Sequence, residues 1–134
     1  MADQAIRLDP NFQPWAAGLF AYTYFAADRY EDSLRMLARL SSETYNRFHA
    51  MMRAASPAAL GRIEEAQTWV AHALELYPDM TIEEFVNQPG YNEDERRRFV
   101  ETMRLAGFPV CAEPARLEGI DKPVRLPECS SAIQ

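Results

Sequence analysis

Apolar residues in this chain recur at helical spacing. Between residues 13 and 26 they return every three or four positions, which places Trp15, Leu19 and Tyr22 on one stripe. The same spacing predicts further helices over residues 2–8, 29–40, 44–60, 63–76, 82–88 and 93–106. We therefore predict an all-α fold.

One helix-turn pattern occurs twice. Residues 27–40 match residues 60–73 at an offset of 33, so that Tyr30 falls on Ile63. A second match, at an offset of 68, pairs residues 5–10 with residues 73–78. A period near 34 that is built from helix pairs is typical of helical-hairpin solenoids. We expect half a repeat followed by two full repeats.

The pattern changes after the second repeat. Thr81-Ile-Glu-Glu84 is a capping-box pattern that begins a short helix. Asn92 and three acidic residues begin another helix, which Gly107 ends. These two helices have polar outer faces, so we predict that they cap the repeats and complete a domain over residues 1–109. Residues 110–134 hold three prolines and no periodic apolar face, which predicts a flexible tail.

Pro57 interrupts the helix predicted for residues 44–60. An interior proline removes one ladder hydrogen bond and clashes with the preceding turn, at a cost of roughly 3 kcal/mol. We expect a kink, or a helix end near Ser56. Ser42 is the expected N-cap of this helix.

Charge and composition exclude several functions. The chain has 20 acidic and 14 basic residues and a net charge of −6. It therefore lacks the basic stripe that displaces counterions, and we expect no nucleic-acid partner. The run Arg96–Arg98 follows three acidic residues and is interpreted as a solvated helix face. Because neither a secretory signal nor a membrane-length apolar run is present, we expect a cytoplasmic protein with no membrane partner.

Candidate catalytic and metal-binding groups are few. Cys111 and Cys129 are the two cysteines. In the cytosol such a pair is usually reduced, and the alternative is a disulfide between them. Neither His49 nor His72 lies at ligand spacing to these thiols, so we expect no metal or cofactor. No serine or cysteine shares an inward helical face with either histidine, and the paired acids occupy first turns of helices, where the dipole favours them. We expect no enzymatic activity.

The repeated motifs resemble those of a known family. Residues 28–33 and 61–66 resemble the Gly-x-Tyr-x-x-Ala core of tetratricopeptide repeats, and Leu8-Asp9-Pro10 resembles their Leu-Asp-Pro ending. Met103–Pro109 is similar to the ending of bacterial adenylate/guanylate cyclases and transcriptional regulators that finish in such repeats. The resemblance covers about residues 2–110. It implies a right-handed solenoid of helical hairpins with a C-terminal capping pair, which serves as the partner-binding segment of a regulatory protein.

In that family the first helix of each repeat lines a concave face. The positions that we expect to bind a protein or peptide partner are Trp15, Tyr22, Phe25, Phe48, Met51 and Ala55. A helix or an extended peptide with apolar anchors fits such a row, whereas the alternative is that the rings only pack between helices. We predict a protein–protein interaction module. The alternative is part of an adenylate/guanylate cyclase whose catalytic domain lies upstream.

The beginning of the chain predicts a second property. Residues 2–8 match the end of a second repeat helix whose first helix is missing, as in a fragment or a gene that begins within a repeat. We then expect Trp15, Leu19 and Tyr22 to be partly exposed beside it. Such an apolar edge usually marks an interface, so we predict self-association through the N-terminal end.

Overall fold

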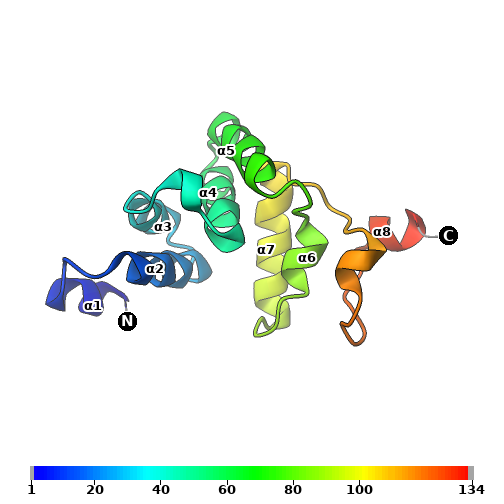
Figure 1. Ribbon diagram of the computed structural model, residues 1–134, viewed down its shortest axis with the longest axis horizontal. Helices are drawn as coiled ribbons and strands as arrows, with labels where there is room; N and C mark the ends of the chain where they lie inside the picture. The colour runs from blue at the N-terminus through cyan, green and yellow to red at the C-terminus, as the bar shows by residue number, and fades with distance from the viewer. Residues whose placement is uncertain (1, 133–134) are drawn as a thin grey trace.

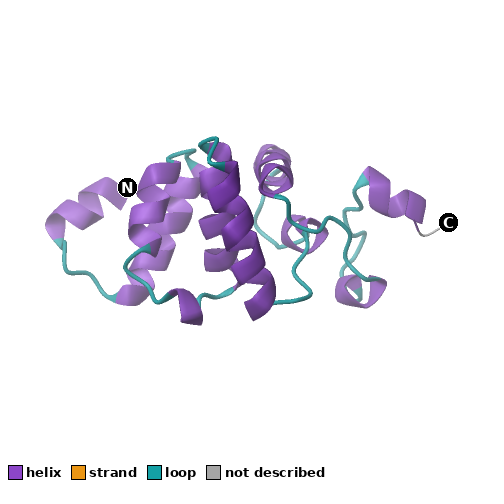
Figure 2. Cartoon of the chain, turned by 90° about the horizontal axis from the view of Figure 1, so that it is seen from above, coloured by secondary structure: helices purple, strands orange, loops and turns teal. Residues whose placement is uncertain are grey.

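The computed structural model describes residues 2–132, which contain helices and loops and no β-strand (Figure 2). The elements in chain order are α1 (Ala2–Leu8), α2 (Pro14–Ala26), α3 (Tyr30–Leu37), the 3-10 turn η1 (Ser42–Thr44), α4 (Arg47–Ala59), α5 (Ile63–Leu76), α6 (Ile82–Val86), α7 (Glu93–Ala106), the 3-10 turn η2 (Pro114–Leu117) and α8 (Pro127–Ala132). The all-α class predicted from the sequence is confirmed. The molecule is elongated, with α1 and α8 at opposite ends (Figure 1).

Helices α2 to α5 form two helix pairs with the same spacing along the sequence. Helix α4 begins 33 residues after α2, and α5 begins 33 residues after α3. The turns inside the pairs also correspond, because Asp28 and Gly61 both adopt a left-handed conformation, with φ of 62° and 83°. Each pair packs across this turn, α2 on α3 and α4 on α5.

Helix α4 lies at the centre of the molecule and packs against α2, α3, α5 and α7 (Figure 1). Most of its residues are alanine or methionine, and the side chains from Ala50 to Ala58 are buried except for Arg53. A helix that is apolar on nearly every side is stable only when neighbours cover it. Helix α7 supplies part of that cover and also reaches the first pair, where Arg98 donates to the Ala26 carbonyl at 3.0 Å.

Two details of α4 differ from the sequence prediction. The helix end expected near Ser56 is wrong, because α4 continues through Pro57 to Ala59. The alternative, a kink at Pro57, stays a prediction. Pro57 lies in the last turn and its ring is fully buried, so core packing offsets one missing ladder bond. The N-cap is Asn46 and not Ser42, because the Asn46 side chain accepts from the His49 backbone N–H at 2.8 Å.

The capping residues predicted for α6 and α7 are confirmed. The Thr81 hydroxyl accepts from the backbone N–H of Glu84, and Asn92 forms a capping box with Glu95. Gly107 ends α7 in the left-handed conformation, with φ of 95°. The residues that follow then turn back along α6.

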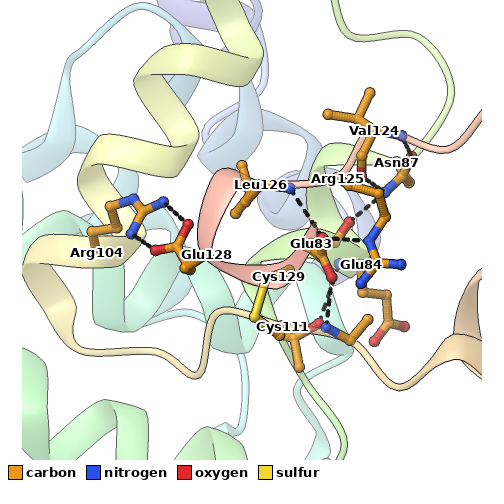
Figure 3. Close-up of a disulfide and its surroundings, with 12 residues drawn as sticks. Glu83, Glu84, Asn87, Arg104, Cys111, Val124, Arg125, Leu126, Glu128 and Cys129 are labelled. Carbon is orange, nitrogen blue, oxygen red and sulfur yellow. Dashed lines mark hydrogen bonds and ion pairs between the residues drawn. A yellow bond between two sulfur atoms is a disulfide. The ribbon is translucent and has the colours of Figure 1, made fainter. Parts of the chain in front are cut away.

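Residues 109–112 and 124–126 bind along α6 and Asn87, which differs from the flexible tail that the sequence predicts for residues 110–134 (Figure 3). Residues 133–134 of that predicted tail lie outside the described residues. The backbone N–H of Ile82 donates to the Pro109 carbonyl at 2.9 Å, and that of Glu83 donates to the Val110 carbonyl at 3.0 Å. Leu117 and Leu126 are buried. The segment is therefore part of the folded unit.

The cysteines also differ from the expected reduced pair. Cys111 and Cys129 form a disulfide, with their Cα atoms 5.3 Å apart. This approach depends on the return of the chain along α6. None of the helices within residues 2–132 combines the length and the apolar character that crossing a membrane requires.

Candidate functional site

An apolar groove of about 460 Å³ lies between α2, α4 and the connection from α6 to α7. Helix α2 contributes one wall, the first two turns of α4 contribute the floor, and the connection closes one side. The lining residues are Trp15, Gly18, Leu19, Tyr22, Asn46, Phe48, His49, Met52, Pro89 and Tyr91.

The α2 wall exposes two large apolar side chains. Trp15 is 70% exposed and Leu19 is 59% exposed, and the four-residue spacing places them on one face of α2. Both line the groove. Scattered apolar residues on a surface are normal, but a contiguous patch beside a groove usually marks a binding surface.

His49 supplies the polar group of the groove. A Cβ added to Gly18 would lie 2.5 Å from His49 Nε2, so glycine at this position lets the imidazole approach α2. His49 Nδ1 accepts the backbone N–H of Asn46 at 3.3 Å, which leaves the proton of the neutral ring on Nε2. Burial lowers the pKa of His49 below its ordinary value. The neutral ring therefore offers one N–H donor beside Gly18.

Stacked aromatic rings form the side of the groove near the α6–α7 connection. Tyr22 and Tyr91 are nearly parallel with ring centroids 6.4 Å apart, and Tyr91 meets Phe99 edge-on at 5.0 Å. Burial, followed by the Glu95 carboxylate, raises the pKa of Tyr22. Burial also raises the pKa of Tyr91, with added contributions from Tyr22 and Glu95. Both phenols stay protonated near neutral pH, in a negative local field.

The structure separates the six predicted contact residues into two groups. Trp15, Tyr22 and Phe48 line the groove. The other three are core residues with at most 1% of their surface exposed: Phe25, Met51 and Ala55. Met51 and Ala55 are buried because neighbouring helices cover α4 on several sides, and Phe25 on α2 packs against Phe99 of α7.

Sequence reasoning missed several lining residues, among them His49, Met52 and Tyr91. His49 had a local signal, since it lies three residues after the N-cap Asn46 and completes a capping box. Tyr91 had none, because it reaches the groove from a connection that follows α2 by more than sixty residues. The predicted residues therefore include part of the α2 wall and Phe48 on α4, but none from the connection between α6 and α7.

Within the described residues, one group of acidic and cysteine side chains lies close enough together to hold a metal ion. The Glu83 carboxylate and the sulfurs of Cys111 and Cys129 all lie within 4.8 Å of one another (Figure 3). Glu83 is fully buried. Neither histidine belongs to this group: His49 faces Gly18, and His72 Nε2 lies 2.9 Å from the Ser42 carbonyl oxygen.

Comparison of the chain with protein-family models, with curated proteins and with solved structures finds no match.

Proposed function

We propose that this protein is an interaction module whose groove between α2 and α4 binds an amphipathic helix of a partner protein. One observation carries the proposal: Trp15 and Leu19 stay 70% and 59% exposed at the edge of an apolar groove. Fully exposing such side chains forgoes roughly 1.5–3 kcal/mol each relative to burial. A partner that covers them recovers that free energy.

The form and charge of the groove favour a basic amphipathic helix. A groove between helices accepts anchors at i, i+3 or i+4 and i+7, and His49 Nε2–H adds one donor for a polar group. The chain carries a net charge of −6, and many of its arginines already pair with its own carboxylates. Glu95 acts on both tyrosines of the groove. Basic residues beside the apolar stripe therefore complement this surface.

The repeat spacing supports a more specific assignment within the same proposal. Two helix pairs with a 33-residue offset and matching left-handed turns agree with tetratricopeptide-type hairpins. We propose on this resemblance that the chain is the partner-binding segment of a bacterial regulatory protein and acts in the cytoplasm.

Selection from a displayed library of helical peptides without tryptophan tests the groove. We expect enriched sequences with a large apolar residue at i, i+4 and i+7 and with lysine or arginine on the flanks. Binding of a selected peptide should shift the fluorescence of exposed Trp15 to shorter wavelength. Trp15→Phe should remove this signal, while Trp69 on α5 provides a constant background.

Matched variants decide where the peptide binds. Leu19→Ala should weaken binding at least about tenfold, as expected for an anchor worth more than 1.4 kcal/mol. Leu105→Ala is the control, since Leu105 is 57% exposed but lies on α7 outside the groove. Equal losses for the two variants, or selected peptides without an apolar stripe, would contradict the proposal.

A further inference from the structure

We propose that Cys111 and Cys129, once reduced, bind a thiophilic divalent cation such as Zn²⁺ together with Glu83. The disulfide and the bound cation are then two alternative states of one site. The grouping that carries this inference is a buried carboxylate oxygen and two sulfurs, all within 4.8 Å of one another (Figure 3). Two thiolates and a carboxylate are established ligands of Zn²⁺.

Contacts other than the disulfide hold both cysteines in place. On one side of the site, the backbone N–H of Ala112 donates to Glu83 Oε1 at 2.9 Å, directly after Cys111. On the other, the backbone N–H of Leu126 donates to Glu83 Oε2 at 3.0 Å, and the N–H of Cys129 donates to the Leu126 carbonyl at 2.9 Å. Reduction therefore leaves two thiols close together on a supported backbone.

A small separation of the sulfurs is enough to admit the ion. In a tetrahedral site each sulfur lies about 2.3 Å from Zn²⁺, so the two sulfurs need to be about 3.8 Å apart. Cys129 is buried whereas Cys111 is exposed, so a cation can reach the site from solvent. Three protein ligands leave the fourth position for a water molecule.

Glu83 retains one acceptor position for the cation. An ionised carboxylate has about four lone-pair sites. Three are used, by the N–H groups of Ala112 and Leu126 and by Arg125 Nε at 2.8 Å. The remaining lone pair belongs to Oε1, which accepts from Ala112 alone among the residues that the structure describes.

The charges also balance. A divalent ion with two thiolates and one carboxylate carries a net charge of −1, and the guanidinium of Arg125 on Glu83 Oε2 neutralises it. Burying an uncompensated charge is costly, so this neutrality favours the occupied state.

The exchange between the two states is a complete redox step. A dithiol reductant gives two electrons and two protons to the Cys111–Cys129 disulfide and becomes a disulfide itself. The two thiols then release their protons to solvent as Zn²⁺ binds their sulfurs. In a reducing compartment, such as the cytoplasm proposed above, the thiol state is the available one.

Titration of the full chain with Zn²⁺ tests the site. After reduction and removal of the reductant under argon, we expect one equivalent to bind per chain, with displacement of thiol protons. Co²⁺ should give the visible and near-ultraviolet bands of tetrahedral thiolate coordination. The oxidised protein is the matched control, because it has the same carboxylates and no free thiol.

Variants assign the ligands. Cys111→Ser leaves one thiolate, so it should weaken the thiolate bands and lower Zn²⁺ affinity by more than about a hundredfold, and Glu83→Gln should lower it by at least about tenfold if it folds. Glu118→Gln, which changes an exposed carboxylate, should bind as the wild type does. Equal Zn²⁺ affinity of the reduced and oxidised chains would overturn the proposal. So would a stoichiometry of one ion per two chains, which would indicate bridging between molecules.

Discussion

Arg125 Nε donates to Glu83 Oε2 at 2.8 Å, and the Glu83 carboxylate at the receiving end has no exposed surface. The two residues are 42 positions apart in the chain. Glu83 lies on the short helix α6, and Arg125 belongs to the segment that returns along it (Figure 3). This ion pair fastens the C-terminal segment to the helical core.

Replacing Glu83 by glutamine should destabilise the protein by about 3 kcal/mol. The change leaves Arg125 without its counter-charge and weakens two backbone hydrogen bonds. Removing one partner of a buried ion pair is strongly destabilising because the other charge is left uncompensated. Urea unfolding followed by circular dichroism measures the loss. Glu101→Gln, an exposed change on α7, should stay within about 0.5 kcal/mol of the wild type. A Glu83→Gln loss that small would mean that the pair does not hold the segment.

Truncation after Pro109 should lower the melting temperature by roughly 10 °C. It removes the buried side chains of Leu117 and Leu126 and leaves Glu83 without donors from the segment. Differential scanning calorimetry measures the change. A full chain with both cysteines replaced by serine separates the contribution of the disulfide, which the loop-entropy relation puts at about 3 kcal/mol. An unchanged melting temperature in the truncated protein would instead support the flexible tail that the sequence predicts.

His49 should make stability depend on pH in the weakly acidic range. Its folded pKa lies below the ordinary value of 6.5 because the ring is partly buried. The unfolded chain therefore binds the proton more readily, so the His49 contribution is complete above pH 6.5 and is lost as pH falls below it. Melting temperatures at about pH 7.5 and pH 5.5 should differ more for wild type than for His49→Gln, whose amide can keep the capping box without titrating. Equal differences for the two proteins would contradict this assignment.

The exposed N-terminal apolar surface should make the isolated chain self-associate. Leu8, Trp15 and Leu19 are 79%, 70% and 59% exposed, and α1 and α2 are neighbours. Size exclusion with light scattering at tens of micromolar should detect species above the monomer mass. Replacing Trp15 and Leu19 by glutamine should restore the monomer, whereas Leu105→Gln should not. A groove-binding peptide should compete with self-association. A wild-type chain that stays monomeric would show that this edge does not bind a second copy.

Local sequence determined helices α1 to α7 and most of their ends, but not α8, which lies in the predicted tail. Side chains three or four positions apart meet on one helix face, and a cap involves residues only three positions apart, so both signals are complete within a short stretch. Thr81, Asn92 and Gly107 therefore act as their neighbours in sequence predict. The equivalence of Asp28 and Gly61 is similarly local, since each forms the turn of its own helix pair.

Tertiary structure alone decided which helix faces stay accessible and where the C-terminal segment lies. Phe25 and Phe48 have the same helical periodicity in the sequence, but only the packing of α7 and of the α6–α7 connection buries one and leaves the other in the groove. The continuation of α4 through Pro57 depends likewise on core contacts around its ring. Glu83 and Arg125 come together over a separation of 42 residues, and the two cysteines come together over 18. A local sequence pattern cannot predict these contacts between distant residues. The free energy that stabilises them arises only when the distant segments pack together and exclude water.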